Sequence, residues 1–351
     1  MWPRYFDRRG DRHDAIYAGV IFMNIIGLDI GGTKCAVIAG TADDGELSVK
    51  EKQVFATDTT IPAERMLKQF YPVIERYIKE FGAECIGISC GGPLNTKTGT
   101  VLCPPNLPNF RNFKITEILQ KKFNIPAFLQ NDANACALAE WLYGAGRGSD
   151  NMIFMTFGTG LGAGLILDGR LYEGVGGNAG EIGHIRLSEN GPVGFGKRGS
   201  FEGFCSGGGI AQLGYTLGLE AHQNGTTPLY FDPKTAPEGI TAKSVAIAAE
   251  QHGDPTAIEV YRLCGEYLGK GLSILIDLFN PERIVIGSIF TRSRNGLWES
   301  CKEVIDREAL PASATECEVL PAMLSEQIGD FAALTVGVYG LKKQNAENKK
   351  A

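Results

Sequence analysis

The chain has 351 residues, 44% hydrophobic and 21% charged, and these ordinary proportions exclude a disordered or collagen-like protein. A formal net charge of −6 excludes a globally basic surface for nucleic acid or anionic membranes. Glycine is in excess, with 46 residues against a typical share of about 7%. Clustered glycine is typical of backbone that approaches a ligand closely.

Nine scattered cysteines without a C-x-x-C pair indicate reduced thiols and a cytoplasmic protein. No apolar run reaches the roughly 20 residues of a membrane-spanning helix, so we predict no membrane segment. Residues 1–22 mix arginines with aspartates, which argues against a signal or transit peptide. We interpret them as a disordered or misassigned extension, and we place the start of the folded protein at Met23.

From Met23 onward, strand and helix signals alternate, which predicts an α/β protein. In the first part of the chain we expect strands at 25–30, 35–39, 47–55, 86–89 and 127–130, and helices at 63–81, 113–123 and 132–142. Glycines connect the first two strands, and an Asp44-Gly45 turn precedes the third.

The second part of the chain partly repeats the first. IIGLDIGGTKCAVI (25–38) and IFMTFGTGLGAGLI (153–166) share a strand, a glycine–threonine turn and a returning strand. This match indicates an internal duplication, with two similar halves facing one cleft. We also expect helices at 200–217, 242–251 and 255–279, a strand at 283–287 and a frayed polar tail after Leu341.

The first glycine turn has the residue types of an anion site. Gly31 and Gly32 let backbone N–H groups approach a phosphate, Thr33 adds a hydroxyl and Lys34 a positive charge. Asp29 could hold Mg²⁺ through water. Taken alone, the turn favours an ordinary tight hairpin, because a short glycine turn is weak evidence for a phosphate site.

The second turn, Gly158-Thr159-Gly160, is followed by Leu161-Gly162. Two such turns at matching places in a duplicated sequence favour the phosphate interpretation. The spacing fits neither a Walker loop nor a Rossmann fingerprint.

Asn131-Asp132 follows a buried strand and opens a helix. Asp132 could be a plain N-cap, because free N–H groups at a helix start stabilise a carboxylate. It is also placed to take a proton from a hydroxyl nucleophile. The two roles are compatible.

Glu181-Ile182-Gly183-His184 places a carboxylate and an imidazole three residues apart, on one side of a turn. The pair could bind vicinal hydroxyls of a sugar or ligate a metal. The other three histidines lie in polar surroundings and are expected at the surface.

At these residues the sequence closely resembles the ROK family, which contains sugar kinases and sugar-responsive repressors. The resemblance extends from Met23 to about Gly340. Seven motifs carry it in order: LDIGGTK (28–34), GISCGGP (87–93), PNLP (105–108), NDANACALAEW (131–141), GTGLGAG (158–164), GEIGH (180–184) and NPERIVIGS (280–288).

The resemblance implies an actin-like ATPase fold, in which two ribonuclease H-like domains close on ATP and a sugar. The N-terminal domain would span 23–130 and be completed by a C-terminal helix at about 326–343. The larger C-terminal domain would span 131–325. Assembly as a homodimer is expected from the resemblance only.

The resemblance also assigns roles. Asp132 would be the base that deprotonates the attacking sugar hydroxyl. Sugar contacts would come from Asn106, Asn131, Glu181, His184 and Glu202, with Gly92 nearby. The phosphates would lie between the turn Gly31, Gly32, Thr33 and Lys34 and the turn Thr159 and Gly160. Gly287 and Ser288 would hold the nucleoside of ATP, and Mg²⁺ would arrive with the nucleotide.

One departure from the family concerns zinc. The family commonly carries C-x-C-G-x-x-G-C-x-E after its histidine, and those three cysteines complete a structural zinc site with it. Here Val193, Phe195 and Ser200 stand at the cysteine positions, and Val and Phe cannot ligate zinc. We predict no zinc, with apolar packing of Val193 and Phe195 in place of the metal. Glu202 is retained.

The leading hypothesis is an ATP-dependent kinase that phosphorylates a hexose, at C6 of glucose by default. N-acetylmannosamine or N-acetylglucosamine is the alternative substrate, and polyphosphate the alternative donor. The competing class is a sugar-responsive repressor, but the 22 residues before Met23 are too few for a DNA-reading domain, and no nucleic acid partner is expected. A sugar-binding scaffold without activity is disfavoured because Asp132 and both glycine turns are present.

Overall fold

The computed structural model describes residues 22–43 and 45–349. Most of the predicted extension 1–22, and Asp44 of the predicted turn, lie outside these ranges. The described chain forms two compact units. Unit 1 comprises 22–150, 166–179 and 326–349, and unit 2 comprises 151–165 and 180–325. The sequence places the main boundary near 130 instead of 150, and that domain division stays a prediction.

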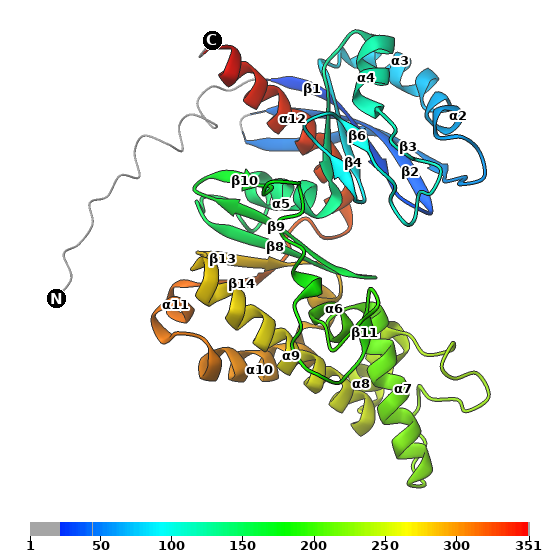
Figure 1. The fold of residues 1–351 in the computed structure, drawn as a ribbon, viewed down its shortest axis with the longest axis vertical. Helices are drawn as coiled ribbons and strands as arrows, with labels where there is room; N and C mark the ends of the chain where they lie inside the picture. The colour runs from blue at the N-terminus through cyan, green and yellow to red at the C-terminus, as the bar shows by residue number, and fades with distance from the viewer. Residues whose placement is uncertain (1–21, 44, 350–351) are drawn as a thin grey trace, which may run out of the picture. The chain divides into compact units, whose positions relative to one another are not determined.

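Unit 1 contains a five-stranded sheet with strand order β3-β2-β1-β4-β7, of which β1 to β4 are labelled in Figure 1. Strand β1 pairs antiparallel with β2 and parallel with β4, which in turn pairs parallel with β7. The near-continuous apolar sequence of β4 fits a strand buried on both faces. The bounds are β1 Met23–Ile30, β2 Lys34–Asp43, β3 Glu46–Ala56, β4 Cys85–Cys90 and β7 Ala127–Asn131.

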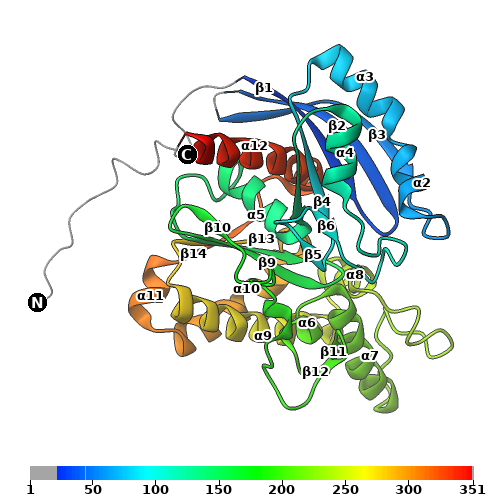
Figure 2. The same cartoon turned by 45° about the horizontal axis from the view of Figure 1, so that its top comes forward.

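Helices cover both faces of this sheet (Figures 1 and 2). On one face lie α2 (Ala63–Lys68), α3 (Tyr71–Phe81) and α4 (Ile115–Phe123), and on the other α12 (Ile328–Asn348). The single helix predicted for 63–81 is wrong, because the chain breaks into α2 and α3. Pro72 lies in the first turn of α3, where it is tolerated, whereas inside one long helix it would remove a hydrogen bond and clash with the preceding turn.

Helix α12 approaches the sheet closely because glycines face it. A Cβ on Gly87 of β4 would lie 2.1 Å from the Ala333 carbonyl oxygen, and one on Gly27 of β1 would lie 3.0 Å from the Ala333 Cβ. The tail expected to fray after Leu341 is helical to Asn348, so that prediction is wrong.

The second half of the chain forms a sheet with order β10-β9-β8-β13-β14. As β1 and β4 do in the first sheet, β8 and β13 pair in parallel, and β13 pairs in parallel with β14. The shared order of the two sheets supports the duplication predicted from the glycine turns. The bounds are β8 Met152–Phe157, β9 Leu161–Leu167, β10 Arg170–Tyr172, β13 Arg283–Ile286 and β14 Glu318–Pro321.

Six α-helices occur in the described part of unit 2: α6 Phe201–Phe204, α7 Gly207–Gln223, α8 Ala242–His252, α9 Pro255–Phe279, α10 Ile289–Glu308 and α11 Pro311–Glu316. The helix predicted for 200–217 is divided at Cys205, because the Ser206 side chain accepts a hydrogen bond from the Gly209 N–H and starts a new helix there. Helix α9 has the predicted bounds. Helix α10 was missed, since its sequence is polar and carries a kink at Ser293.

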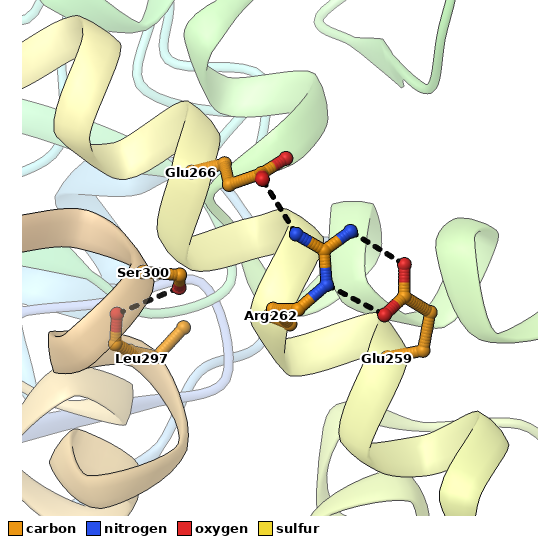
Figure 3. A network of polar contacts seen from close by, with 5 residues as sticks. All are labelled: Glu259, Arg262, Glu266, Leu297 and Ser300. Carbon is orange, nitrogen blue, oxygen red and sulfur yellow. Dashed lines mark hydrogen bonds and ion pairs between the residues drawn. The ribbon is translucent and has the colours of Figure 1, made fainter. Parts of the chain in front are cut away.

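Helices α9 and α10 pack through small residues. A Cβ on Gly265 would lie 2.4 Å from the Leu297 carbonyl oxygen, which accepts a hydrogen bond from the Ser300 hydroxyl (Figure 3). On the same helix as Gly265, the Arg262 side chain bridges Glu259 and Glu266 (Figure 3). That exposed ion network stabilises α9 only slightly.

The remaining elements are short or are described with the site: β5 Leu94–Asn95, β6 Thr100–Val101, α5 Asp132–Tyr143, η1 Ile182–His184, β11 Val193–Gly194, β12 Lys197–Arg198 and η2 Ser325–Gln327. Within 22–43 and 45–349, no helix combines the length and hydropathy that spanning a bilayer requires.

Candidate functional site

The turn between β1 and β2 is fixed by its own backbone and by Thr57. The Gly31 N–H donates to the Lys34 carbonyl oxygen at 3.1 Å. The Thr57 hydroxyl donates to the Gly31 carbonyl oxygen at 2.6 Å, and the Thr57 N–H donates to the Thr33 carbonyl oxygen at 3.0 Å. Gly32, Thr33 and Lys34 are exposed, so their polar groups are available to a ligand.

Gly32 allows Asn106 to approach this turn. A Cβ on Gly32 would lie 2.6 Å from the Asn106 Cβ and 3.0 Å from its carbonyl oxygen. Any larger residue at position 32 would displace the segment that carries Asn106. The structure therefore brings together a predicted phosphate turn and a predicted sugar contact.

The carboxyl ends of β1, β4 and β7 lie side by side, with Ile30 opposite Cys90 and Cys90 opposite Asn131. A Cβ on Gly92, just after β4, would lie 3.3 Å from the Asn131 Nδ2, and one on Gly91 would lie 3.9 Å from the Asp132 Oδ2. In open α/β sheets this edge is where ligands bind. The first predicted turn, Gly92 and the Asn131-Asp132 pair thus gather at one edge.

The N-cap of α5 is Asn131 and not Asp132. The Asn131 Oδ1 accepts from the Ala133 N–H at 3.0 Å and from the Asn134 N–H at 3.4 Å, and this corrects the simple N-cap interpretation of Asp132. Asp132 is the first residue of the helix, and its Oδ1 accepts from the Ala133 N–H at 2.8 Å. Because the Asn131 side chain caps the helix, the second carboxylate oxygen of Asp132 is not needed as a cap and can contact a ligand.

The Asp132 side chain reaches solvent, yet protein packed around it desolvates the carboxylate and raises its pKa above the usual value. The hydrogen bond from the Ala133 N–H opposes this rise. A carboxylate with a raised pKa is a stronger base than an ordinary aspartate, which is what proton abstraction from a hydroxyl requires.

The negative charges near the Asp29 carboxylate outweigh the positive ones. Burial, followed by the charges of Asp330 and Asp132, raises its pKa to about 6, although Lys52 and Lys34 act in the opposite direction. Lys52 is itself engaged by Asp330, with 2.6 Å between Nζ and Oδ1. A cation brought to Asp29 would relieve this repulsion, so the residues fit Mg²⁺ delivered with a nucleotide.

A buried polar network supports the β7–α5 junction, and the sequence analysis did not find it. The Gln130 Oε1 accepts from the Asn131 N–H at 2.8 Å and from the Asn134 Nδ2 at 3.2 Å. The Gln130 Nε2 donates to the Glu173 Oε1 at 3.1 Å, and the Thr96 hydroxyl donates to the same oxygen at 2.8 Å. Gln130, 7% exposed, therefore holds the backbone at the predicted base.

In unit 2, the turn between β8 and β9 has a similar construction. The Gly158 N–H donates to the Gly160 carbonyl oxygen at 3.1 Å, and the Gly207 N–H donates to the Gly158 carbonyl oxygen at 2.7 Å. A Cβ on Gly158 would lie 3.4 Å from the Ser288 Oγ. Thr159 is exposed, whereas Gly287 is buried. The second phosphate turn and the predicted nucleoside position are thus neighbours.

Glu202, on α6, is bonded to this turn. Its Oε2 accepts from the Leu161 N–H at 3.0 Å, and a Cβ on Gly160 would lie 2.8 Å from the same oxygen. Gly183 is also close, because a Cβ there would lie 3.2 Å from the Glu202 Cβ. Glu202 therefore joins the glycine turn to the segment that carries Glu181 and His184.

Glu181 and His184 are both exposed at the ends of the short helix η1, where the His184 N–H donates to the Glu181 carbonyl oxygen at 3.2 Å. The His184 ring meets the Phe195 ring edge to face, with centroids 5.3 Å apart. The expected apolar packing of Val193 and Phe195 is wrong, because the two residues are 42% and 73% exposed. Among the described residues, no group of His, Cys, Asp and Glu side chains has the arrangement of a metal site.

Two sheets of the same order, each with a glycine turn between its first strands, define an actin-like ATPase fold. Residues 25–339 match the ROK family, and the chain belongs to that family.

The relatives include kinases and regulators. A glucokinase from Halalkalibacterium halodurans is 33% identical over 313 residues, which are 87% of this chain and 92% of that protein. The DNA-binding transcriptional dual regulator NagC of Escherichia coli K12 is 31% identical over 272 residues, 76% of this chain and 63% of NagC. A ROK family glucokinase structure from Streptomyces griseus, in complex with glucose and AMPPNP, has a TM-score of 0.71 and 29% identity. The match covers 90% of this chain and all of that one.

Proposed function

We propose that the protein is an ATP-dependent sugar kinase that transfers the γ-phosphate to a hexose hydroxyl, with C6 of glucose as the first candidate. The observation that carries the proposal is the gathering of Asp29, the Gly31–Thr33 turn and Asp132 at one sheet edge. These are the parts that phosphoryl transfer requires: an anion turn, a carboxylate for the metal and a base for the nucleophile.

In this mechanism Asp132 accepts the proton of the attacking hydroxyl at the carboxylate oxygen that does not bond the Ala133 N–H. The proposed sugar contacts are Asn106, Asn131, Glu181, His184 and Glu202. Holding the hydroxyl in place removes much of the entropic barrier of a bimolecular reaction. The raised pKa of Asp132 implies that kcat/KM falls as the pH decreases through that pKa, because the protonated carboxyl cannot act as a base.

ATP would supply the transferred phosphoryl group, and Mg²⁺ would neutralise the charge that develops on it. The residues proposed to hold them are Asp29, Gly31, Gly32, Thr33, Lys34, Gly158, Thr159, Gly160, Gly287 and Ser288. The similarity to a glucokinase solved with AMPPNP supports ATP as the donor. Polyphosphate stays the alternative donor. We further propose a cytoplasmic homodimer that binds neither nucleic acid nor membrane.

N-acetylmannosamine and N-acetylglucosamine are the alternative substrates, because the predicted sugar contacts Glu181, His184 and Glu202 suit them equally. The second candidate function is a sugar-binding transcriptional regulator without catalysis, and the match to NagC supports it.

The test is ADP release from purified protein with ATP, Mg²⁺ and a panel of glucose, fructose, mannose, allose, N-acetylglucosamine and N-acetylmannosamine. We expect turnover on one or few of these sugars. Asp132→Asn should lose at least two orders of magnitude in kcat while still binding sugar. If no sugar supports turnover but some raise the melting temperature, the kinase proposal is overturned and the regulator is favoured.

A further inference from the structure

The loop after His184 contains a two-stranded hairpin, β11 and β12, in which Val193 pairs with Arg198. Its turn residues, Phe195 and Gly196, have φ angles of 42° and 75°, as in the two-residue hairpin turns that need positive φ at both positions. Backbone hydrogen bonds close the base of the loop, because the Phe201 N–H donates to the Ile185 carbonyl oxygen at 2.8 Å and the Gly199 N–H to the Pro192 carbonyl oxygen at 2.8 Å. The Arg186 guanidinium adds a bond to the Arg198 carbonyl oxygen at 2.8 Å.

The residues of this hairpin do not fit the zinc site that the family resemblance implies at positions 193, 195 and 200. Val193 and Phe195 carry no ligand atom. The Ser200 hydroxyl is buried and accepts the capping hydrogen bond of α6 from the Gly203 N–H at 3.0 Å. Cys205 is also unsuitable, since its buried Sγ donates to the Cys264 carbonyl oxygen at 3.6 Å.

Side-chain contacts join the hairpin to α7 and to His184 instead. On α7, the Gln212 Oε1 accepts from the Val193 N–H at 2.9 Å, and the Gln212 Nε2 donates to the Val193 carbonyl oxygen at 2.9 Å. This pair of bonds gives the amide one possible orientation. On β12, the Lys197 Nζ donates to the His184 carbonyl oxygen, while Phe195 contacts the His184 ring.

We propose that Gln212, Lys197 and Phe195 form a metal-free clasp that positions His184 for the sugar. Gln212 holds β11, the first strand of the hairpin, in place. The hairpin in turn places Lys197 against the His184 carbonyl oxygen and Phe195 against the His184 ring. These three are positioning residues. The inference rests on the proposed function for its substrate, and on the hydrogen bonds and the ring contact for the clasp.

The test compares Gln212→Met and Lys197→Met with wild-type protein. Gln223→Met is the matched control, because it places the same substitution on an exposed residue of the same helix. One hydrogen bond of ordinary net strength corresponds to roughly a fivefold effect, and two correspond to roughly a thirtyfold effect. We expect the KM for the sugar to rise by up to about thirtyfold in Gln212→Met and up to about fivefold in Lys197→Met. In both variants kcat and the KM for ATP should stay within about twofold of wild type. Lys197→Arg should restore most of the loss.

Hydrogen–deuterium exchange of the peptide that contains Val193 gives a second readout that needs no activity. Gln212→Met should raise exchange there and leave the loop base protected. Unchanged exchange overturns the clasp, and raised exchange with an unchanged sugar KM overturns its positioning role. If wild-type protein phosphorylates no sugar, the proposed function fails, and sugar-induced thermal shifts of the same variants then replace KM. Stoichiometric zinc in the purified protein, or a sugar KM that a chelator of zinc changes at saturating Mg²⁺, also overturns the inference.

Discussion

Asp29, a residue of the candidate site, lowers the stability of the ligand-free protein when its carboxylate is ionised. Its pKa of about 6 in the folded protein lies above its ordinary value of 3.8. An acid whose pKa is raised by folding favours the folded state when it is protonated, so this stabilisation is present below about pH 4 and is lost as the pH rises through about 6. At neutral pH the ionised Asp29 therefore destabilises the ligand-free protein.

We expect Asp29→Asn to raise the free energy of unfolding at pH 7.5 by on the order of 1–3 kcal/mol, and to change it little at pH 4. Denaturant unfolding of the ligand-free protein at both pH values measures this. Asp43→Asn, an exposed carboxylate on the same sheet, is the control. An equal effect of Asp29→Asn at both pH values would contradict the electrostatic explanation.

At the scale of elements, the β7–α5 junction depends on Gln130, which is bonded to Asn131, Asn134 and Glu173. We expect Gln130→Leu to lower the free energy of unfolding by roughly 2–4 kcal/mol, because it leaves buried polar groups without partners. In a kinase assay kcat should fall about tenfold or more, since a small displacement of Asp132 misaligns the base.

Glu173→Gln should be milder, because a glutamine oxygen can still accept the bonds from Thr96 and Gln130. The same substitution at an exposed position of this sheet, Gln53→Leu, should change neither unfolding nor kcat. Urea unfolding and initial rates measure both effects. A Gln130→Leu protein as stable and active as Gln53→Leu would show that the network does not support the junction.

Local sequence patterns predicted most of the helices, strands and turns. They failed where two local signals disagree and where the contacting residues lie far apart in the sequence. The turns at Gly31 and Gly158 were accessible because glycines separate two apolar runs. Pro72 was a visible signal for the break between α2 and α3, but the regular spacing of apolar residues masked it. The bond between Gln130 and Glu173 joins residues 43 positions apart, and Gln212 meets Val193 across 19. The hydrophobic periodicity of helices and strands relates only residues a few positions apart, so it cannot predict such pairs.

At the scale of the whole molecule, the nine cysteines are all free. Six are buried: Cys35, Cys85, Cys90, Cys205, Cys264 and Cys301. Burial raises the pKa of the Cys85 thiol to about 12 and the pKa of the Cys136 thiol well above its usual value. Since the thiolate is the reactive form, the native protein should react slowly with thiol reagents.

We expect at most the three partly buried thiols, Cys103, Cys136 and Cys317, to react with Ellman's reagent within minutes at pH 7.5. All nine should react once the protein is denatured, without added reductant. Fewer than nine in the denatured sample would reveal a disulfide and contradict the assignment of free thiols.

The packing of α12 against the first sheet has a consequence for synthesis. The glycines of β1 and β4 face a helix that begins only at Ile328, so the ribosome must make more than two hundred further residues before that face of the sheet can be covered. Because domains generally fold as units during translation, the nascent chain carries an uncovered apolar surface for tens of seconds at elongation rates of about 5–20 residues per second. We expect newly made chains to need protection from aggregation until α12 emerges, and chains that terminate before α12 to aggregate.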